Sequence, residues 1–168
     1  MRSKGRVWRF GDDINTDLII PGRYLDNYDP AHLASHAMEC VSKEFAKNVG
    51  KGDVIVAGRN FGCGSSREQA VVALKHAGVS AVVAKSFARI FYRNAINLGL
   101  PVITSSDACD LFIDGDIVII DTSEGAMISE SRQVTARIDP IPDHVRKILD
   151  AGGLVPYIKG AIAGRAQG

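Results

Sequence analysis

The sequence predicts a mixed α/β fold with a core of parallel strands, helices on its faces and an antiparallel addition near the C-terminus. Two observations carry this prediction. Between residues 53 and 104, short apolar segments alternate with longer helix-forming ones, and parallel strands need such crossover connections. After Ser106 the pattern changes to short strand-like segments separated by turn-forming residues, which is typical of antiparallel strands.

The first 50 residues are expected to hold one strand followed by polar loops and two helical pieces. Val7, Trp8 and Phe10 stand among basic residues and indicate the strand. Pro30 suits a first helical turn, where its missing N–H is not needed. In chain order we expect a strand at 5–10, a polar loop at 11–17, an apolar segment at 18–21, an exposed connection at 22–27 and helical pieces at 30–38 and 41–48.

The central segment is expected to alternate strands and helices around one glycine-rich loop. Gly78 ends the first helix, and Gly99 and Pro101 end the second, because glycine and proline terminate helices readily. The expected elements are strands at 53–57, 81–84 and 101–104, a glycine-rich loop at 58–64, and helices at 65–76 and from 87 to Gly99.

The C-terminal third is expected to form an antiparallel meander and a last helix. The strands are predicted at 116–121, 126–129 and 133–138, and the helix at 142–151, where Gly152-Gly153 caps it. The tail after Gly160 is small and polar enough that we expect it to fray. Residues 1–168 are interpreted as a single domain, because the composition offers no boundary.

The composition is that of an ordinary globular protein. Hydrophobic residues make up 46% of the 168 residues, charged residues 23%, and the formal net charge is +1, so nothing indicates a nucleic acid partner. The longest apolar runs are too short to cross a membrane, and we expect a cytoplasmic location. Cys40, Cys63 and Cys109 are widely spaced, so they predict neither a disulfide framework nor a complete metal site.

The segment 58–68 is the candidate binding site. It places glycines and hydroxyls between a strand end and a helix start, where free backbone N–H groups and the helix dipole favour anions. It lacks the lysine of a phosphate-binding loop and the spacing of a dinucleotide motif. On spacing alone, Ser65-Ser66-Arg67-Glu68 also fits a capping box, in which Ser65 has a purely structural role.

Four ordered motifs between residues 5 and 104 resemble those of the swivelling domain of the aconitase superfamily, in its stand-alone small-subunit form. They are Asn15-Thr16-Asp17 with Ile19-Ile20-Pro21, then Tyr24-Leu25, then Asn60-Phe61-Gly62-Cys63-Gly64-Ser65-Ser66-Arg67-Glu68, then Ser86-Phe87-Ala88-Arg89-Ile90-Phe91. The length and the ending Gly152-Gly153-Leu154 also resemble isopropylmalate isomerase small subunits. The resemblance implies a three-layer β/β/α swivelling domain.

The resemblance also implies an activity. It would be that of a hydro-lyase that interconverts 2-isopropylmalate and 3-isopropylmalate in leucine biosynthesis. This chain would bind no metal, and a 4Fe-4S cluster is expected on a large subunit, in a heterodimer or heterotetramer. Small subunits of homoaconitase and of citramalate, methylmalate or dimethylmalate dehydratases are alternatives, as is a carboxylate- or RNA-binding module, although the near-neutral charge argues against RNA.

Site residues are carried over by motif position. Ser65 resembles the serine that removes the carbon-bound proton, and Asp17 the aspartate that helps to organise the site. Ser66 and Arg67 resemble residues that hold a substrate carboxylate and the reactive oxygen. The remaining expected substrate-binding residues follow the first motif: Arg23, Tyr24, Leu25, Asp26 and Asn27.

Two positions depart from the family pattern. Gln69 stands where histidine is common, a change we expect to be tolerated because both side chains form neutral hydrogen bonds. Asp26 stands where isopropylmalate enzymes tend to have an apolar residue and homoaconitate enzymes an arginine. An aspartate would suit neither an isopropyl group nor a carboxylate, so Asp26 either points away from the substrate or indicates another acid.

Overall fold

The computed structural model describes residues 1–165, which form one seven-stranded mixed sheet with the strand order β4-β3-β2-β1-β5-β6-β7. Strand β1 lies in the middle, parallel to β2 and antiparallel to β5, so one half of the sheet is parallel and the other antiparallel. The strands are β1 (Arg2–Arg9), β2 (Val54–Ala57), β3 (Ala81–Ala84), β4 (Val102–Thr104), β5 (Ile117–Asp121), β6 (Ala126–Ser129) and β7 (Val134–Arg137).

The helices are mostly short. They are α1 (Thr16–Ile19), the 3-10 helix η1 (Gly22–Tyr24), α2 (Pro30–Ser35), α3 (Phe45–Asn48), α4 (Glu68–Ala77), α5 (Arg89–Asn97), α6 (Ala108–Leu111), α7 (Asp143–Asp150) and α8 (Leu154–Arg165). The expected strands and the two central helices are confirmed, with β1 beginning three residues earlier than predicted. The single-turn helices α1 and α6 were not predicted, because four residues carry too little periodicity to recognise.

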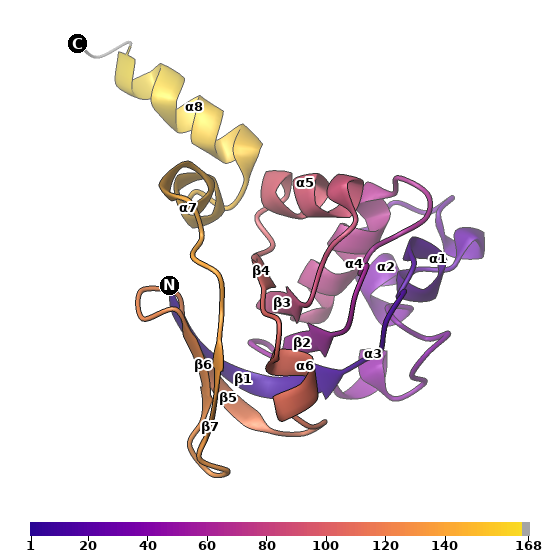
Figure 1. Ribbon diagram of the computed structural model, residues 1–168. Helices are drawn as coiled ribbons and strands as arrows, with labels where there is room; N and C mark the ends of the chain where they lie inside the picture. The colour runs from indigo at the N-terminus through magenta and orange to yellow at the C-terminus, as the bar shows by residue number, and fades with distance from the viewer. Residues whose placement is uncertain (166–168) are drawn as a thin grey trace.

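Three layers are formed because alternate residues of the parallel strands face two different cores. Ile55 and Ala57 face the helices and share a cluster with Leu74 of α4. Val54 and Val56 face the other way, toward the antiparallel strands and α6. The antiparallel half therefore curls under the parallel half, while the long helices lie on the opposite side (Figure 1). This confirms the β/β/α arrangement, in which the short helix α6 is packed on the face that the antiparallel strands cover.

Helix α4 starts later than the capping-box pattern predicts. Arg67, with an extended backbone, occupies the N-cap position and makes no side-chain capping hydrogen bond, so the helix begins at Glu68. Contacts with the segment after β1 hold the preceding turn: the Thr16 hydroxyl donates to the Ser65 carbonyl at 3.0 Å. The predicted helix start at Ser65 and the alternative interpretation of Ser65 as a helix cap are therefore wrong, because long-range contacts decide the backbone there.

Two other helix predictions are wrong in their extent. Helix α2 ends at Ser35, and turns lead to α3 at Phe45, so the two predicted helical pieces are shorter than expected. The C-terminal segment does not fray at Gly160, because α8 runs on to Arg165 and projects beyond α7 (Figure 1). None of the helices within residues 1–165 is both long and apolar enough to cross a membrane.

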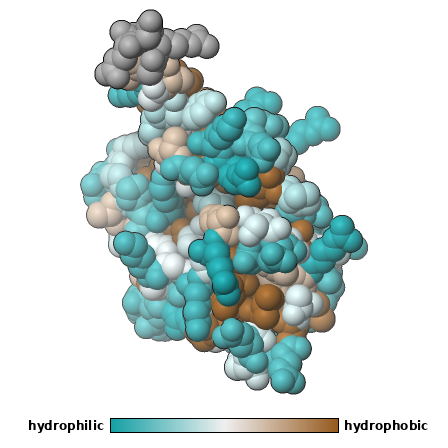
Figure 2. Space-filling model, turned by 90° about the vertical axis from the view of Figure 1, so that its left-hand side faces the viewer, coloured by the Kyte–Doolittle hydropathy of each residue, from teal (hydrophilic) through white to brown (hydrophobic). Residues whose placement is uncertain are grey.

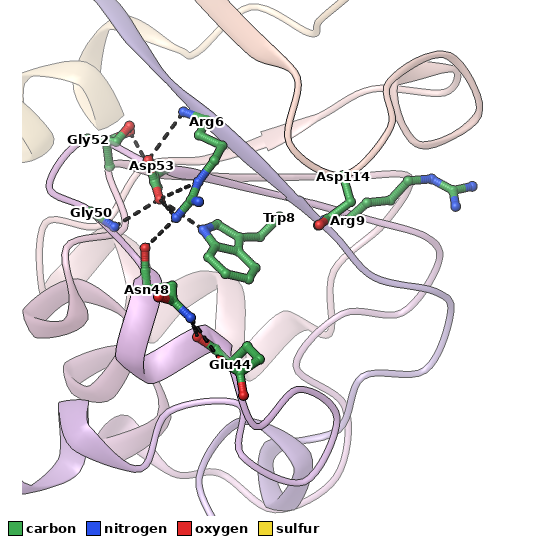
Figure 3. Close-up of polar contacts among 10 residues, drawn as sticks. Arg6, Trp8, Arg9, Glu44, Asn48, Gly50, Gly52, Asp53 and Asp114 are labelled. Atoms are coloured by element: carbon green, nitrogen blue, oxygen red, sulfur yellow. Dashed lines mark hydrogen bonds and ion pairs between the residues drawn. The ribbon is translucent and has the colours of Figure 1, made fainter.

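Asp53, just before β2, contacts Arg6 and Trp8 of β1 (Figure 3), and it lies at the end of these strands opposite the glycine-rich loop. Its carboxylate accepts hydrogen bonds from the Trp8 indole at 2.9 Å, from the Gly50 amide at 2.9 Å and from the Arg6 guanidinium at 3.1 Å. Partial burial alone would raise the pKa of Asp53, but these bonds outweigh it and hold the pKa below its ordinary value. The ionised form is therefore the one that stabilises the fold.

The outer side of the curled sheet is partly hydrophobic, because Ile117 and Ile119 of β5 and Ile128 of β6 are exposed or half-buried there. Hydrophilic residues cover most of the face in Figure 2, and hydrophobic residues gather in its lower part. Among the strand residues, Ile117 of β5 is 46% exposed.

Candidate functional site

The segments that follow β1, β2 and β3 meet at one edge of the sheet, as parallel strands require. Asn15 pairs with Cys63, and Phe61 with Phe87, in isolated parallel bridges. The Thr16 amide also donates to the Cys63 carbonyl at 2.9 Å. The Asn15-Thr16-Asp17 motif is thereby fixed against the glycine-rich turn, so these two loops lie together at this edge of the sheet, here called the rim.

Asp17 and Arg67 form an ion pair across this rim. Asp17 lies in the first turn of α1, where Asn15 caps the helix by accepting from the Leu18 amide at 2.9 Å. The Arg67 side chain is only 22% exposed, whereas that of Asp17 is 60% exposed. Arg67 is thus held from one side by a carboxylate that faces water, so a carboxylate ligand can compete for it.

The turn before α4 depends on glycines with left-handed backbones. Gly62 has φ +79°, and a Cβ built there would lie 2.1 Å from Cγ of Phe91. Gly64 has φ +91° and lies beside the Thr16 hydroxyl. Glycine adopts such angles without steric cost, so the chain can turn sharply and present Ser65 and Ser66, both exposed, just before the helix start.

The segment 22–28, here called the 22–28 loop, lies alongside the start of α4. A Cβ built at Gly22 would lie 3.8 Å from Nη1 of Arg67. At the other end of the loop, the Tyr28 hydroxyl donates to the Glu68 carboxylate. Partial burial, together with this bond to a negative charge, raises the pKa of Tyr28 to about 12. A surface hollow is lined by Tyr28, Ser66, Glu68, Gln69 and Asn94.

Within the loop, Arg23 and Tyr24 turn toward the segment after α2. Arg23 forms an ion pair with Glu39, and the Tyr24 hydroxyl donates to the same carboxylate at 3.3 Å. The Tyr24 ring stacks on His36 with centroids 3.7 Å apart. These contacts involve neither Ser65 nor Arg67. The side chains of Arg23 and Tyr24 are therefore bound away from the turn that carries Ser65 and Ser66.

The rest of the loop has a mixed environment. Leu25 is half-buried and packs against the helical core, while Asp26 is exposed. The Asn27 side chain accepts from the Asp29 amide at 3.0 Å, a local turn contact. Of the residues predicted from sequence, the structure therefore gathers Asp17, Ser65, Ser66 and Arg67, whereas the 22–28 loop lies beside them and points several of its side chains elsewhere.

Sequence reasoning missed some residues that build this region. Thr16, Tyr28 and Glu39 each hold one of its segments. Thr16 belongs to the Asn15-Thr16-Asp17 motif and carries a hydroxyl group, so it could have been identified from the sequence as a hydrogen-bonding residue of the site. No such signal marked Glu39 or Tyr28, because their hydrogen-bond partners lie 16 and 40 residues away in the sequence.

In the described part of the chain, the side chains that could bind a metal ion lie too far apart for three of them to share one. Within the described residues 1–165, no three histidine, cysteine, aspartate or glutamate side chains are grouped so that they could hold a metal ion. Cys109 is buried beside the Phe10 carbonyl, and Cys40 is exposed after α2. The rim instead offers hydroxyls, a guanidinium and a helix start, a set of groups suited to binding a carboxylate.

Comparisons with known proteins agree with this chemistry. Residues 13–107 match the family model described as the aconitase C-terminal domain. The chain is 59% identical over 154 residues to the methanogen homoaconitase small subunit of Methanothermobacter thermautotrophicus, covering 92% of this chain and 89% of that protein. It is 50% identical over 158 residues to the 3-isopropylmalate dehydratase small subunit of Syntrophus aciditrophicus. This match covers 94% of this chain and 96% of that protein.

A solved structure shows the same similarity. The crystal structure of 3-isopropylmalate dehydratase (leuD) from Methanocaldococcus jannaschii matches with a TM-score of 0.95 and 51% sequence identity, and the match covers 99% of each chain. The matched region therefore includes the rim, the 22–28 loop and the curled antiparallel strands.

Proposed function

Because the chain belongs to the aconitase C-terminal domain family, we propose that it is the small subunit of a 3-isopropylmalate dehydratase. With a large subunit it would interconvert 2-isopropylmalate and 3-isopropylmalate by removing and adding back water. The observation that carries the proposal is the near full-length identity of about 50% to small subunits of that name, combined with Ser65 and Arg67 at one rim.

In this proposal Ser65 accepts the proton from the substrate carbon. Its hydroxyl is exposed and is not used as the cap of α4, since Arg67 takes that position. A serine can act as a base only if nearby dipoles or cations stabilise its anion, and the start of α4 and the Arg67 guanidinium supply both. Arg67 and Ser66 would hold a substrate carboxylate, and this carboxylate would displace Asp17 from the guanidinium.

The iron-sulfur cluster that the family implies is assigned to the large subunit. The described part of this chain has no set of side chains that fits such a cluster. The small subunit would contribute proton transfer and carboxylate binding, so we expect the active complex to need both chains.

A homoaconitase small subunit is the second candidate. The 59% identity to the Methanothermobacter protein of that name favours it. Asp26 does not decide between the two, because its side chain is exposed at the tip of the loop and accepts no described hydrogen bond within residues 1–165.

The test is a substrate panel on the complex reconstituted anaerobically with the large subunit from the same organism. The unsaturated intermediate is followed by its ultraviolet absorbance with isopropylmalate, homocitrate, citramalate and dimethylmalate. We expect turnover of isopropylmalate and none by either subunit alone. A preference for homocitrate would favour the homoaconitase small subunit over the 3-isopropylmalate dehydratase small subunit. An absence of activity with every acid would refute both proposals.

A further inference from the structure

We infer that Glu39 is a positioning residue that sets the conformation of the 22–28 loop and keeps Arg23 away from the substrate. The inference rests on the proposed function and deepens it. A loop held in this way suits a substrate whose variable group is uncharged.

The first step is that the loop borders the rim. Gly22 lies against Arg67, and Tyr28 is bonded to Glu68, the first residue of α4. Both ends of the loop are therefore next to the segment that carries Ser65 and Ser66. The conformation between these ends decides which side chains reach a bound molecule.

The second step is that both oxygens of a single carboxylate hold the loop. Oε1 of Glu39 pairs with the Arg23 guanidinium. Oε2 accepts from the Tyr24 hydroxyl at 3.3 Å and contacts Nδ1 of His36 at 2.9 Å. The Glu39 side chain is 24% exposed and that of Arg23 is 63% exposed, so the carboxylate is the more sheltered partner of the pair.

The third step is that aromatic stacking makes the arrangement stiff. Tyr24 stacks on His36 at an interplanar angle of 10°, and the Arg23 guanidinium lies 4.7 Å from the centre of the Tyr24 ring. Arg23, Tyr24 and His36 are thus ordered together around Glu39. The contact with Glu39 turns the Arg23 guanidinium toward the segment after α2, so it lies away from the turn that carries Ser65 and Ser66.

The experiment compares three variants of the reconstituted complex. Glu39→Ala removes the whole anchor, and Glu39→Gln keeps an acceptor for Tyr24 but loses the charge that pairs with Arg23. Glu124→Gln, in the exposed turn between β5 and β6, is the matched control. For each, kcat and KM are measured with isopropylmalate and with homocitrate, and circular dichroism checks the fold.

With Glu39→Ala we expect KM for isopropylmalate to rise about three- to tenfold, because the loop is no longer held, while kcat changes less than about twofold. The preference for isopropylmalate over homocitrate, as a ratio of kcat/KM, should fall by a similar factor because Arg23 is freed. Glu39→Gln should lie between Glu39→Ala and the wild type, and Glu124→Gln should equal the wild type. Adding Arg23→Gln to Glu39→Ala should remove the gain with homocitrate.

A loss in kcat alone, or an unchanged substrate ratio in both Glu39 variants, would overturn the inference. A wild-type complex that prefers homocitrate would overturn it too. If Glu39→Ala does not fold, the KM and the substrate ratio of Glu39→Gln test the inference instead.

Limited trypsin digestion of the isolated small subunit separates this inference from the proposed function. The peptide cut after Arg23 is quantified by mass spectrometry. We expect Glu39→Ala to be cut there about threefold faster or more than Glu124→Gln, because a released loop is a better protease substrate. Faster cutting together with a wild-type complex that turns over no acid would refute the function but support the positioning role, whereas equal cutting refutes the positioning role whatever the activity.

Discussion

Two carboxylates at opposite ends of the parallel strands differ in burial, and therefore in how much their ion pairs stabilise the fold. Asp53 lies before the strand with a side chain only 10% exposed, and it receives hydrogen bonds from Arg6, Trp8 and Gly50. Asp17 pairs with Arg67, which follows the strand, and is 60% exposed. Water screens the second pair, so it contributes little stability and a ligand can replace it.

Asp53→Asn should lower the free energy of unfolding by about 2–3 kcal/mol at neutral pH, because the amide loses the charge that pairs with Arg6 and keeps only one acceptor oxygen for the donors of Arg6, Trp8 and Gly50. The folded pKa of Asp53 is below its unfolded value of about 3.9. Its contribution is therefore complete above that value and is lost as the pH falls through the folded pKa, so the two proteins should converge in acid. Urea unfolding of the wild type and Asp53→Asn between pH 3 and pH 7 measures this difference in the free energy of unfolding.

The matched control is Asp143→Asn in an exposed pair with Arg146, which should change stability by less than about 0.5 kcal/mol. A difference between wild type and Asp53→Asn that stays constant down to pH 3 would contradict the ionised role of Asp53.

Ser65→Ala should reduce kcat of the reconstituted complex about 10²–10⁴-fold and leave KM within a few-fold, because a base acts in the transition state while Arg67 still binds the carboxylate. Ser123→Ala, in an exposed turn, is the control. Steady-state kinetics with the preferred acid measure both. If Ser65→Ala retains more than about half of the wild-type kcat, the proton is removed by another group.

At the scale of elements, the turn between β2 and α4 decides where the site residues stand. The local pattern predicted a helix from Ser65, but the bridges from Asn15 to Cys63 and from Phe61 to Phe87, with the hydrogen bond from the Thr16 hydroxyl to the Ser65 carbonyl, hold this segment in a turn. The helix starts three residues later, and the serines lie in an open turn instead of a first helical turn. Tertiary contacts thus overrode a local preference worth about 1 kcal/mol.

Gly62→Ala should destabilise the protein by about 2–4 kcal/mol, because the new methyl group would meet the buried ring of Phe91 and the left-handed backbone is unfavourable for alanine. Gly11→Ala is the control, since a Cβ there meets nothing within 4 Å. Thermal unfolding compares the two variants. Equal stability of both would show that α5 moves away from the turn at little cost.

At the scale of the whole molecule, the position of β1 in the sheet organises the fold. It pairs with a parallel strand on one side and an antiparallel strand on the other, so the chain's first strand joins both halves. The antiparallel half then covers one face of the parallel half, and the helices cover the other (Figure 1). This leaves the carboxyl ends of β1, β2 and β3 at one rim, where parallel sheets commonly bind ligands.

The sequence by itself determined the strands, the two central helices and the motif residues Asp17, Ser65, Ser66 and Arg67. Periodicity, glycines and motif spacing are local signals and can be read without coordinates. Only the tertiary structure decided that the antiparallel strands curl over the sheet, that α4 begins at Glu68, and that Glu39 and Tyr28 hold the two ends of one loop. These features depend on contacts between residues far apart in the chain, and local sequence preferences carry no information about such contacts.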